Sequence, residues 1–292
     1  MSEPRPAPID PAAYTEEYFR SSVEGHAEFA ASGGRALSPR LARALDLAGV
    51  KPGQRVLDIA CGRGEVVVQS ARRGAYAVGI DYAAAAIAVA RDAVDAANGA
   101  GTALARMDAT RLALRPATFD VAFMLDFVEH VHQPDLERAF DEVWSALRPG
   151  GRLIMHTSPN RVFENVVYPH YVRNVHRTVL ALARAVRLEN RFFNRFVMPT
   201  DPLLPHDEYE RRLHVNPQSA SSLRDALVRR GFRVRRVDHW EPPRERFFDE
   251  RLRWHNAGLA LLDVVRFLRP FSYYPPLNRL FSNHVWVMAE RG

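Results

Sequence analysis

The sequence predicts an α/β fold with a mostly parallel sheet and helices on both faces. Three observations support this fold class. Between residues 55 and 157, short apolar runs alternate with longer amphipathic segments, which is typical of strands joined by crossover helices. The small-residue loop Ala60–Gly64 connects the first apolar run to the first amphipathic segment, as in a strand–turn–helix unit. Pro149, Gly150 and Gly151 make a turn into the last strand of this region.

The chain enters this core through a helical segment. Residues 1–12 are expected to form a disordered lead-in, and Tyr14 to about Ala48 carries helical patterning with a break at Gly33-Gly34. The predicted strands are 55–59, 76–80, 103–107, 119–125 and 151–157. The predicted helices between them are 65–73, 83–97 and 135–147.

The C-terminal part adds two strands to the sheet and interrupts it with two insertions. A helix is predicted at 219–230 and strands at 232–240 and 284–289, the last as an antiparallel pair with its neighbour. The predicted organisation is a disordered lead at 1–12, a helical cap and cofactor-binding half at 13–160, a helical lid insertion at 161–216, a core helix and strand at 217–240, a second apolar and aromatic insertion at 241–282, and the last strand at 283–292.

Both insertions carry apolar residues that are expected to be buried against another surface. The first has one apolar helical face, formed by Val172, Val175, Val179, Leu182 and Val186, with arginines largely on its other faces. A lid helix packed on the core is the favoured interpretation, and a basic surface that meets a membrane or a lipid-like substrate is the alternative. The second insertion is apolar on several faces, which indicates burial against the first insertion, against an apolar substrate or in a homodimer.

Composition excludes several classes of protein. The single cysteine rules out an intramolecular disulfide framework and fits a cytoplasmic location. No apolar stretch approaches the ~20 residues of a membrane-spanning helix. The net charge of +6 could indicate nucleic acid, but the basic residues are spread along the chain, without a stripe of interleaved aromatics. Nucleic acid is therefore an unfavoured partner, and a small molecule is preferred.

Three acids after successive strands define the expected ligand. Asp58 lies within the first strand–loop junction, where a carboxylate repels a pyrophosphate but suits a cationic ligand that carries an amino acid. Asp81 ends the second strand, where a carboxylate can accept hydrogen bonds from ribose hydroxyls. Asp108 ends the third strand and could meet an adenine amino group. Cys61, inside the loop, is interpreted as a small residue and not as a nucleophile.

Five motifs in order resemble the class I S-adenosylmethionine-dependent methyltransferases. They are VLDIACGRG at 56–64, GIDY at 79–82, Met107-Asp108-Ala109, FDVAFMLDFVEHV at 119–131 and LRPGGRLIMHTSPN at 147–160. The resemblance implies a Rossmann-like seven-stranded sheet with an antiparallel last strand, helical lids, and S-adenosylmethionine as cofactor. It implies these cofactor-binding residues: Tyr18, Asp58, Ala60, Gly62, Gly64, Asp81, Tyr82, Asp108, Ala109 and Leu125. In some relatives an N-terminal cap reaches the cofactor's carboxylate, a role open here to Tyr14, Tyr18 and Arg20.

Candidates for acceptor chemistry cluster after the fourth strand. If a helical turn begins at Asp126, then Asp126, Glu129 and His130 share one face of it, where they could bind a cation or hold an acceptor hydroxyl near a base. His156, at the end of the fifth strand, is a third candidate base beside Glu129 and His130.

The same cluster resembles the E-x-x-E-H metal motif of small-RNA 2′-O-methyltransferases and ubiquinone-pathway O-methyltransferases, with Asp126 in place of the first glutamate. This likeness implies a divalent metal such as Mg²⁺ on Asp126, Glu129, His130 and His214. The preferred function is O-methylation of a small molecule, and the apolar insertions favour an apolar acceptor. Alternatives are RNA 2′-O-methylation with a metal, N- or C-methylation of a small molecule, and a cofactor-binding scaffold without turnover.

Overall fold

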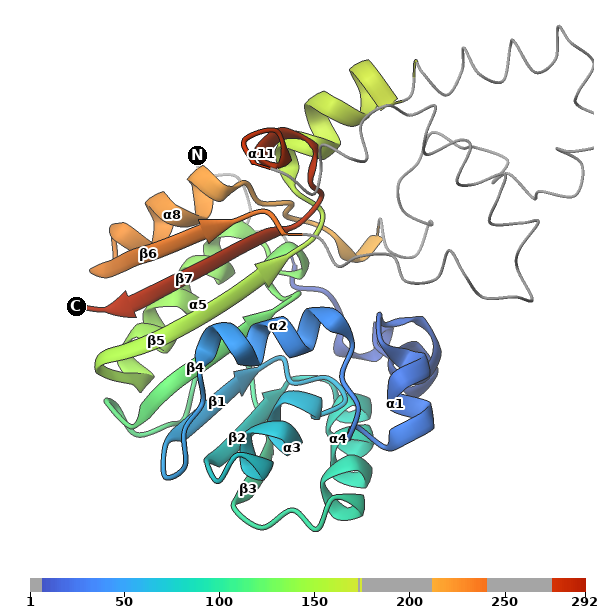
Figure 1. The fold of residues 1–292 in the computed structure, drawn as a ribbon, viewed down its shortest axis with the longest axis vertical. Coiled ribbons are helices and arrows are strands. Elements are labelled where there is room, and N and C mark those ends of the chain that lie inside the picture. Colours follow the sequence, from blue (N-terminus) through green and yellow to red (C-terminus); the bar gives the residue numbers. More distant parts are fainter. Residues whose placement is uncertain (1–6, 173, 175–211, 241–274) are drawn as a thin grey trace, which may run out of the picture. The chain divides into compact units, whose positions relative to one another are not determined.

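Seven strands form one sheet in the order β3-β2-β1-β4-β5-β7-β6 (Figure 1). The computed structural model describes residues 7–172, 174, 212–240 and 275–292. The strands are β1 Arg55–Ile59, β2 Tyr76–Asp81, β3 Thr102–Arg106, β4 Phe119–Leu125, β5 Leu147–Thr157, β6 Phe232–Asp238 and β7 Val285–Arg291. Five of them form the parallel ladder β3-β2-β1-β4-β5. In Figure 1 the arrow of β7 points opposite to those of β5 and β6, which confirms the predicted antiparallel last strand.

Continuous apolar runs place β1 and β4 in the centre of the sheet. Val56 to Ile59 are buried, as expected for a strand that is covered on both faces. Asp58 is the one charged residue among these buried positions, and it pairs in register with Gly79 of β2 and Phe123 of β4. Chain order reverses between β1 and β4, so a crevice for ligands is expected at their carboxyl ends.

Helices cover both faces of the sheet (Figure 1). The α-helices are α1 His26–Ser32, α2 Pro39–Ala48, α3 Glu65–Arg72, α4 Ala84–Ala96, α5 Gln133–Ala146, α8 Ala220–Val228 and α11 Asn278–Phe281. Short 3-10 segments are η1 Pro11–Ala13 and η3 Val128–His130, and π-helical segments are η2 Tyr18–Ser22 and η4 Phe163–Val172. Local sequence explains α2 well, because Ser38 caps it through the Leu41 N–H and Pro39 begins it.

The lead-in differs from its prediction at its end. Asp10 accepts the Ala12 N–H and caps η1. Pro8 and Ile9 then line a pocket described below, so this stretch forms part of the pocket wall. The proline-rich composition of the lead-in suggested disorder, but residues Pro8 and Ile9 are ordered as part of the pocket lining.

The chain divides into two compact units, and the sheet belongs to the first. That unit comprises residues 1–157, 213–237 and 286–292, and the second comprises 158–212 and 238–285. In the second unit, Asn160 donates from its side chain to the Ser282 carbonyl at 3.0 Å. No helix among the described residues is long and apolar enough to cross a membrane.

Most of the two predicted insertions lies outside the described residues. This includes the apolar face from Val175 to Val186 and the apolar run at 259–268. The expected lid, membrane contact and homodimer therefore stay predictions.

Candidate active site

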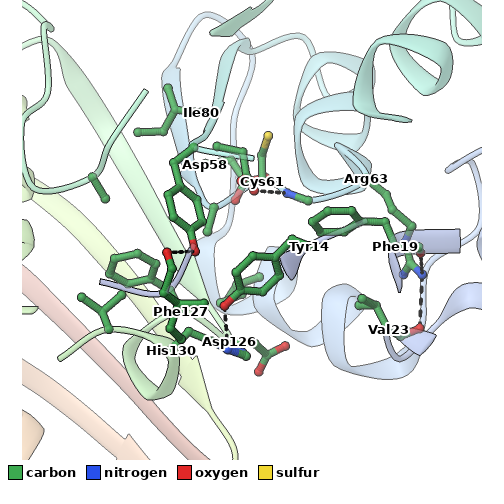
Figure 2. A pocket seen from close by; sticks show the side chains of 18 of the residues that line it. Tyr14, Phe19, Val23, Asp58, Cys61, Arg63, Ile80, Asp126, Phe127 and His130 are labelled. Carbon is green, nitrogen blue, oxygen red and sulfur yellow. Dashed lines mark hydrogen bonds between the residues drawn. The ribbon is translucent and has the colours of Figure 1, made fainter. Parts of the chain in front are cut away.

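A pocket opens at the carboxyl ends of β1, β2 and β4, within the first unit (Figure 2). It collects residues from the loop after β1, the ends of β2 and β3, the segment after β4 and the N-terminal cap. Nine of the ten predicted cofactor residues line it: Tyr18, Asp58, Ala60, Gly62, Asp81, Tyr82, Asp108, Ala109 and Leu125. Gly64 is the tenth, and it is absent from the lining.

The loop after β1 is bent by three residues with positive φ. These are Ala60 at +56°, Gly62 at +49° and Gly64 at +78°. Gly64 fits this conformation and also packs closely, since a Cβ there would lie 3.0 Å from the Ala90 Cβ. Ala60 carries its Cβ in a region that alanine adopts at a cost of about 1 kcal/mol. The sequence indicated only that alanine leaves room for a ligand, and the structure adds that it is strained.

Two buried carboxylates, those of Asp58 and Asp81, line the pocket. Asp81 accepts the Gly62 N–H on Oδ2 at 3.1 Å and the Ala83 N–H on Oδ1 at 2.9 Å, which ties the loop to β2. Burial raises the pKa of Asp81, and these backbone hydrogen bonds offset part of that rise. Burial raises the pKa of Asp58 well above its ordinary value, and the charges of Asp81 and Glu65 raise it further. Such a pair favours a ligand that brings positive charge.

We expect Asp58→Asn to increase the stability of the ligand-free protein at neutral pH. A raised pKa means that the folded state holds its proton more tightly than the unfolded chain. The resulting stabilisation is complete below the unfolded pKa of about 3.9 and is lost as the pH rises through the raised value. Asparagine removes this loss. Urea unfolding at about pH 5 and about pH 8 measures the gain in free energy of unfolding, which should be larger at about pH 8. An equal gain at both pH values would contradict this account. The surface variant Asp92→Asn is the control, and the same pH dependence in that variant would also contradict it.

Arg63 fastens the N-terminal cap to the cofactor loop. Its guanidinium donates to both carboxylate oxygens of Glu65, at 3.0 and 3.1 Å. It also donates to the carbonyl oxygens of Phe19 and Val23 at 3.2 Å and of Glu24 at 2.8 Å (Figure 2). The arginine is buried, so all five donors are used away from bulk water. The order of the cap is thus coupled to the order of the loop.

Arg20, predicted as a cap residue near the cofactor, lies elsewhere. Its guanidinium pairs with Asp92 at 2.7 Å and with Glu16 at 3.7 Å, and it is not part of the pocket lining. Helical patterning located the cap, but it did not determine which arginine of this region faces inward.

Aromatic side chains form part of the pocket wall, and one of them pairs with a histidine. The Tyr14 hydroxyl lies 3.2 Å from Nδ1 of His130, and Figure 2 shows the two side chains pointing at each other. The Tyr14 ring also makes edge contacts with Tyr18 and Tyr82, at centroid distances of 5.5 and 5.7 Å. Burial raises the pKa of Tyr14, so its phenol stays protonated at neutral pH. Burial likewise raises the pKa of Tyr82, to about 12.

The structure separates Asp126 from the predicted metal set. Asp126 has φ +50° and precedes η3, so it does not share a helical face with Glu129 and His130. Its carboxylate is bound instead by Arg40 and by His156. Glu129, His130 and His214 do come together, with one ligand atom from each lying within 4.8 Å of the others. Glu129 is buried and accepts the Thr157 hydroxyl at 2.8 Å.

His156 is not placed as a base for the acceptor. Its side chain is 1% exposed and is absent from the pocket lining. Its ring packs on Trp286 at a centroid distance of 4.4 Å, and its Nδ1 contacts Asp126 Oδ1 at 2.5 Å. Burial, reinforced by the charge of Arg40, lowers the pKa of His156 well below its ordinary value. The strand-end position was predicted correctly, but the side chain points into the protein.

Sequence reasoning missed the two arginines that organise this site, Arg40 and Arg63. Arg63 occupies the variable position between Gly62 and Gly64, and Arg40 lies in the first turn of α2. The only available signal was an arginine inside an otherwise small-residue loop. The carbonyl partners of Arg63 lie in the cap, 39 to 44 residues earlier in the chain, and Arg40 joins Glu24 of the cap to Asp126 after β4.

Comparisons with known proteins agree with this geometry. Residues 56–151 match a family model described as a methyltransferase domain. A demethylmenaquinone methyltransferase of Thermus thermophilus is 35% identical over 120 residues, which are 40% of this chain and 53% of that protein. A ubiquinone biosynthesis O-methyltransferase of Aeromonas salmonicida is 36% identical over 107 residues, which are 36% of this chain and 43% of that protein. The chain therefore spans about half the length of these relatives.

A solved structure extends the likeness to the whole fold. An S-adenosylmethionine-dependent methyltransferase from Mesorhizobium loti superposes with a TM-score of 0.54 at 20% identity, over 87% of this chain and 96% of that one. At this identity the match shows the fold alone. The family model and the two relatives show a methyltransferase domain over residues 56–151, and the ordered loop, strands and acids of this domain are those of the class I S-adenosylmethionine-dependent methyltransferases.

Proposed function

We propose that this protein transfers a methyl group from S-adenosylmethionine to an oxygen atom of a small, largely apolar acceptor. One observation carries the proposal: a single pocket joins the buried carboxylates Asp58 and Asp81 to the Tyr14–His130 pair. The cofactor supplies an activated methyl group on a sulfonium. The protein then has to align donor and acceptor, exclude water and remove the acceptor's proton.

His130 is proposed as the group that takes this proton. With its Nδ1–H donating to the Tyr14 oxygen, the neutral imidazole presents Nε2 as an acceptor. Tyr14 then orients the ring and stabilises the imidazolium that forms. Since the phenol of Tyr14 keeps its own proton, it does not compete as the base. Glu129, predicted as a candidate base, is assigned a supporting role because its side chain is buried and accepts the Thr157 hydroxyl.

The charge of the pocket supports a small acceptor over RNA. Six carboxylates line it, from Asp58, Glu65, Asp81, Asp108, Asp126 and Asp135, against two arginines, Arg40 and Arg63. A phosphate-rich substrate would be repelled by this excess of negative charge. Salt-sensitive binding of a single-stranded RNA oligonucleotide would favour the alternative function.

A divalent metal is a second candidate feature of the same site. Glu129, His130 and His214 offer one carboxylate and two imidazoles, a donor set that suits a transition-metal ion better than the Mg²⁺ expected from sequence. Such an ion would acidify an acceptor hydroxyl and so replace His130 as the means of removing its proton. The base proposal predicts that activity survives chelation. Loss of activity that Mn²⁺ or Zn²⁺ restores would assign the three residues to a metal.

Deuteriomethyl-labelled cofactor tests the proposed reaction. We expect label transfer to apolar phenols or quinols in a defined panel, with one S-adenosylhomocysteine formed per methyl group. Label only in amines or in RNA would select those alternatives, and cofactor binding without transfer to any acceptor would indicate a scaffold.

We expect His130→Ala to lower kcat by about 10²–10⁴-fold, the range for a lost general base, while the Kd of the cofactor stays within about twofold. His26→Ala, at the start of α1, provides the control. Equal kcat values for the two variants would remove His130 from the reaction.

A further inference from the structure

Asp126 lines the pocket and is held in an unusual backbone conformation. It follows β4 with φ +50°, a region that aspartate tolerates better than most residues with a side chain. Its N–H donates to the His156 carbonyl at 3.0 Å, which fixes the turn to β5. As a result the side chain lines the pocket beside Phe127 and His130 (Figure 2).

Two buried side chains, His156 and Arg40, contact the carboxylate of Asp126. His156 Nδ1 lies 2.5 Å from Oδ1, and Arg40 Nη1 contacts Oδ2. Arg40 is 5% exposed and uses its Nε to bind Glu24 Oε2 at 2.5 Å. Glu24 in turn accepts the Ser38 hydroxyl at 3.2 Å. Each carboxylate oxygen of Asp126 thus has one fixed partner, so its rotation is blocked.

Among the residues that the structure describes, Arg40 is the cation in contact with Asp126, and it does not neutralise this carboxylate alone. Arg40 is shared between two carboxylates, those of Glu24 and Asp126. Burial alone would raise the pKa of Glu24, but the charge and hydrogen bond of Arg40 lower it, so Glu24 is ionised at neutral pH. Since the buried His156 is neutral, the four groups together carry one net negative charge.

The carboxylate also keeps capacity for another partner. Two ionised oxygens can accept about four hydrogen bonds, and the structure shows one partner on each. The side chain remains 30% exposed. Among these four groups, Asp126 and Arg40 line the pocket, whereas Glu24 and His156 do not.

We propose that Asp126 is an acceptor-binding residue, which takes a hydrogen bond from an O–H or N–H group of the acceptor and rejects acceptors that carry a negative charge. This inference rests on the proposed methyltransferase function and defines the charge class of its substrate. Arg40 and His156 act as positioning residues, since they fix the direction of the carboxylate, and Glu24 prevents Arg40 from neutralising it.

A matched pair of probes tests the proposal without requiring turnover. Methyl 4-hydroxyphenylacetate and 4-hydroxyphenylacetate share a phenol and differ in one negative charge. We expect the wild-type protein, saturated with S-adenosylhomocysteine, to bind the ester at least about tenfold more tightly than the acid, as measured by calorimetry. In Asp126→Asn this preference should shrink to about threefold or less, mainly through tighter binding of the acid.

Asp92→Asn is the control, because it removes a negative charge from the protein surface outside the pocket. It should leave the ester preference unchanged, whereas Glu24→Gln should reduce the preference, since Arg40 is then no longer shared with a second carboxylate. An unchanged preference in Asp126→Asn, an equal change in Asp92→Asn, or no binding of either probe to the wild type would each overturn the role of Asp126. Absence of methyl transfer to any acceptor would refute the proposed function separately, since the binding preference does not depend on it.

Discussion

Replacing Arg63 by methionine is expected to lower the free energy of unfolding by about 3–5 kcal/mol, the range for breaking a buried ion pair from one side. Glu65 would stay buried without its cation, and its pKa, already raised by burial, would rise further. The carbonyl oxygens of Phe19, Val23 and Glu24 would each lose a donor at the same time. Methionine preserves most of the apolar volume, so the loss reports polar contacts and not a cavity.

Urea unfolding of Arg63→Met measures this effect against Arg20→Met. Arg20 belongs to the same N-terminal region, but its ion pair with Asp92 is exposed, at 45% and 68% of the two side chains. Such a surface pair contributes about 1 kcal/mol or less. Similar losses in the two variants would show that Arg63 does not fasten the cap.

Asp81→Asn is expected to weaken binding of S-adenosylmethionine by about 100-fold, with little change in the fold. Asp81 accepts N–H groups on both oxygens, whereas asparagine has one oxygen and would turn an N–H₂ group toward one of these donors. Hydrogen bonds to a charged group contribute about 1.5–3 kcal/mol each, and 100-fold corresponds to about 2.7 kcal/mol. The loop at Gly62 would lose its fixed position, and the ribose would lose its expected acceptor.

Calorimetric titration with the cofactor tests this expectation, with Asp92→Asn as the control for removing an acid from the protein surface. Thermal unfolding of both variants shows whether the fold is kept. Cofactor affinity within about threefold of the wild type in Asp81→Asn would remove Asp81 from the binding site.

The strand–loop–helix unit around Asp58 could be predicted because its signals are local. An apolar run, a bend of small residues and an amphipathic segment lie within about twenty residues. They predict a strand, a turn and a helix in that order. The order of Asp58, Asp81 and Asp108 along the chain then placed three acids at one sheet edge, because parallel strands present their carboxyl ends together. Asp58, Asp81 and Asp108 all line the pocket.

The direction of individual side chains after β4 and β5 could not be predicted in the same way. Spacing suggested a helical face for Asp126, Glu129 and His130, but the left-handed turn at Asp126 rotates its carboxylate away from the other two. That turn is fixed by His156 and Arg40, which come from a neighbouring strand and from α2. Such contacts carry no periodic signature in the sequence.

The pocket is expected to bind a cationic sulfonium cofactor and not a dinucleotide. The most direct test is calorimetric titration of the ligand-free protein with S-adenosylmethionine and, separately, with NAD⁺. The positive charge of S-adenosylmethionine favours the ionised forms of Asp58 and Asp81, so we expect measurable binding of this cofactor and no measurable binding of NAD⁺, whose pyrophosphate disfavours those forms. Tight binding of NAD⁺ with no binding of S-adenosylmethionine would contradict the account.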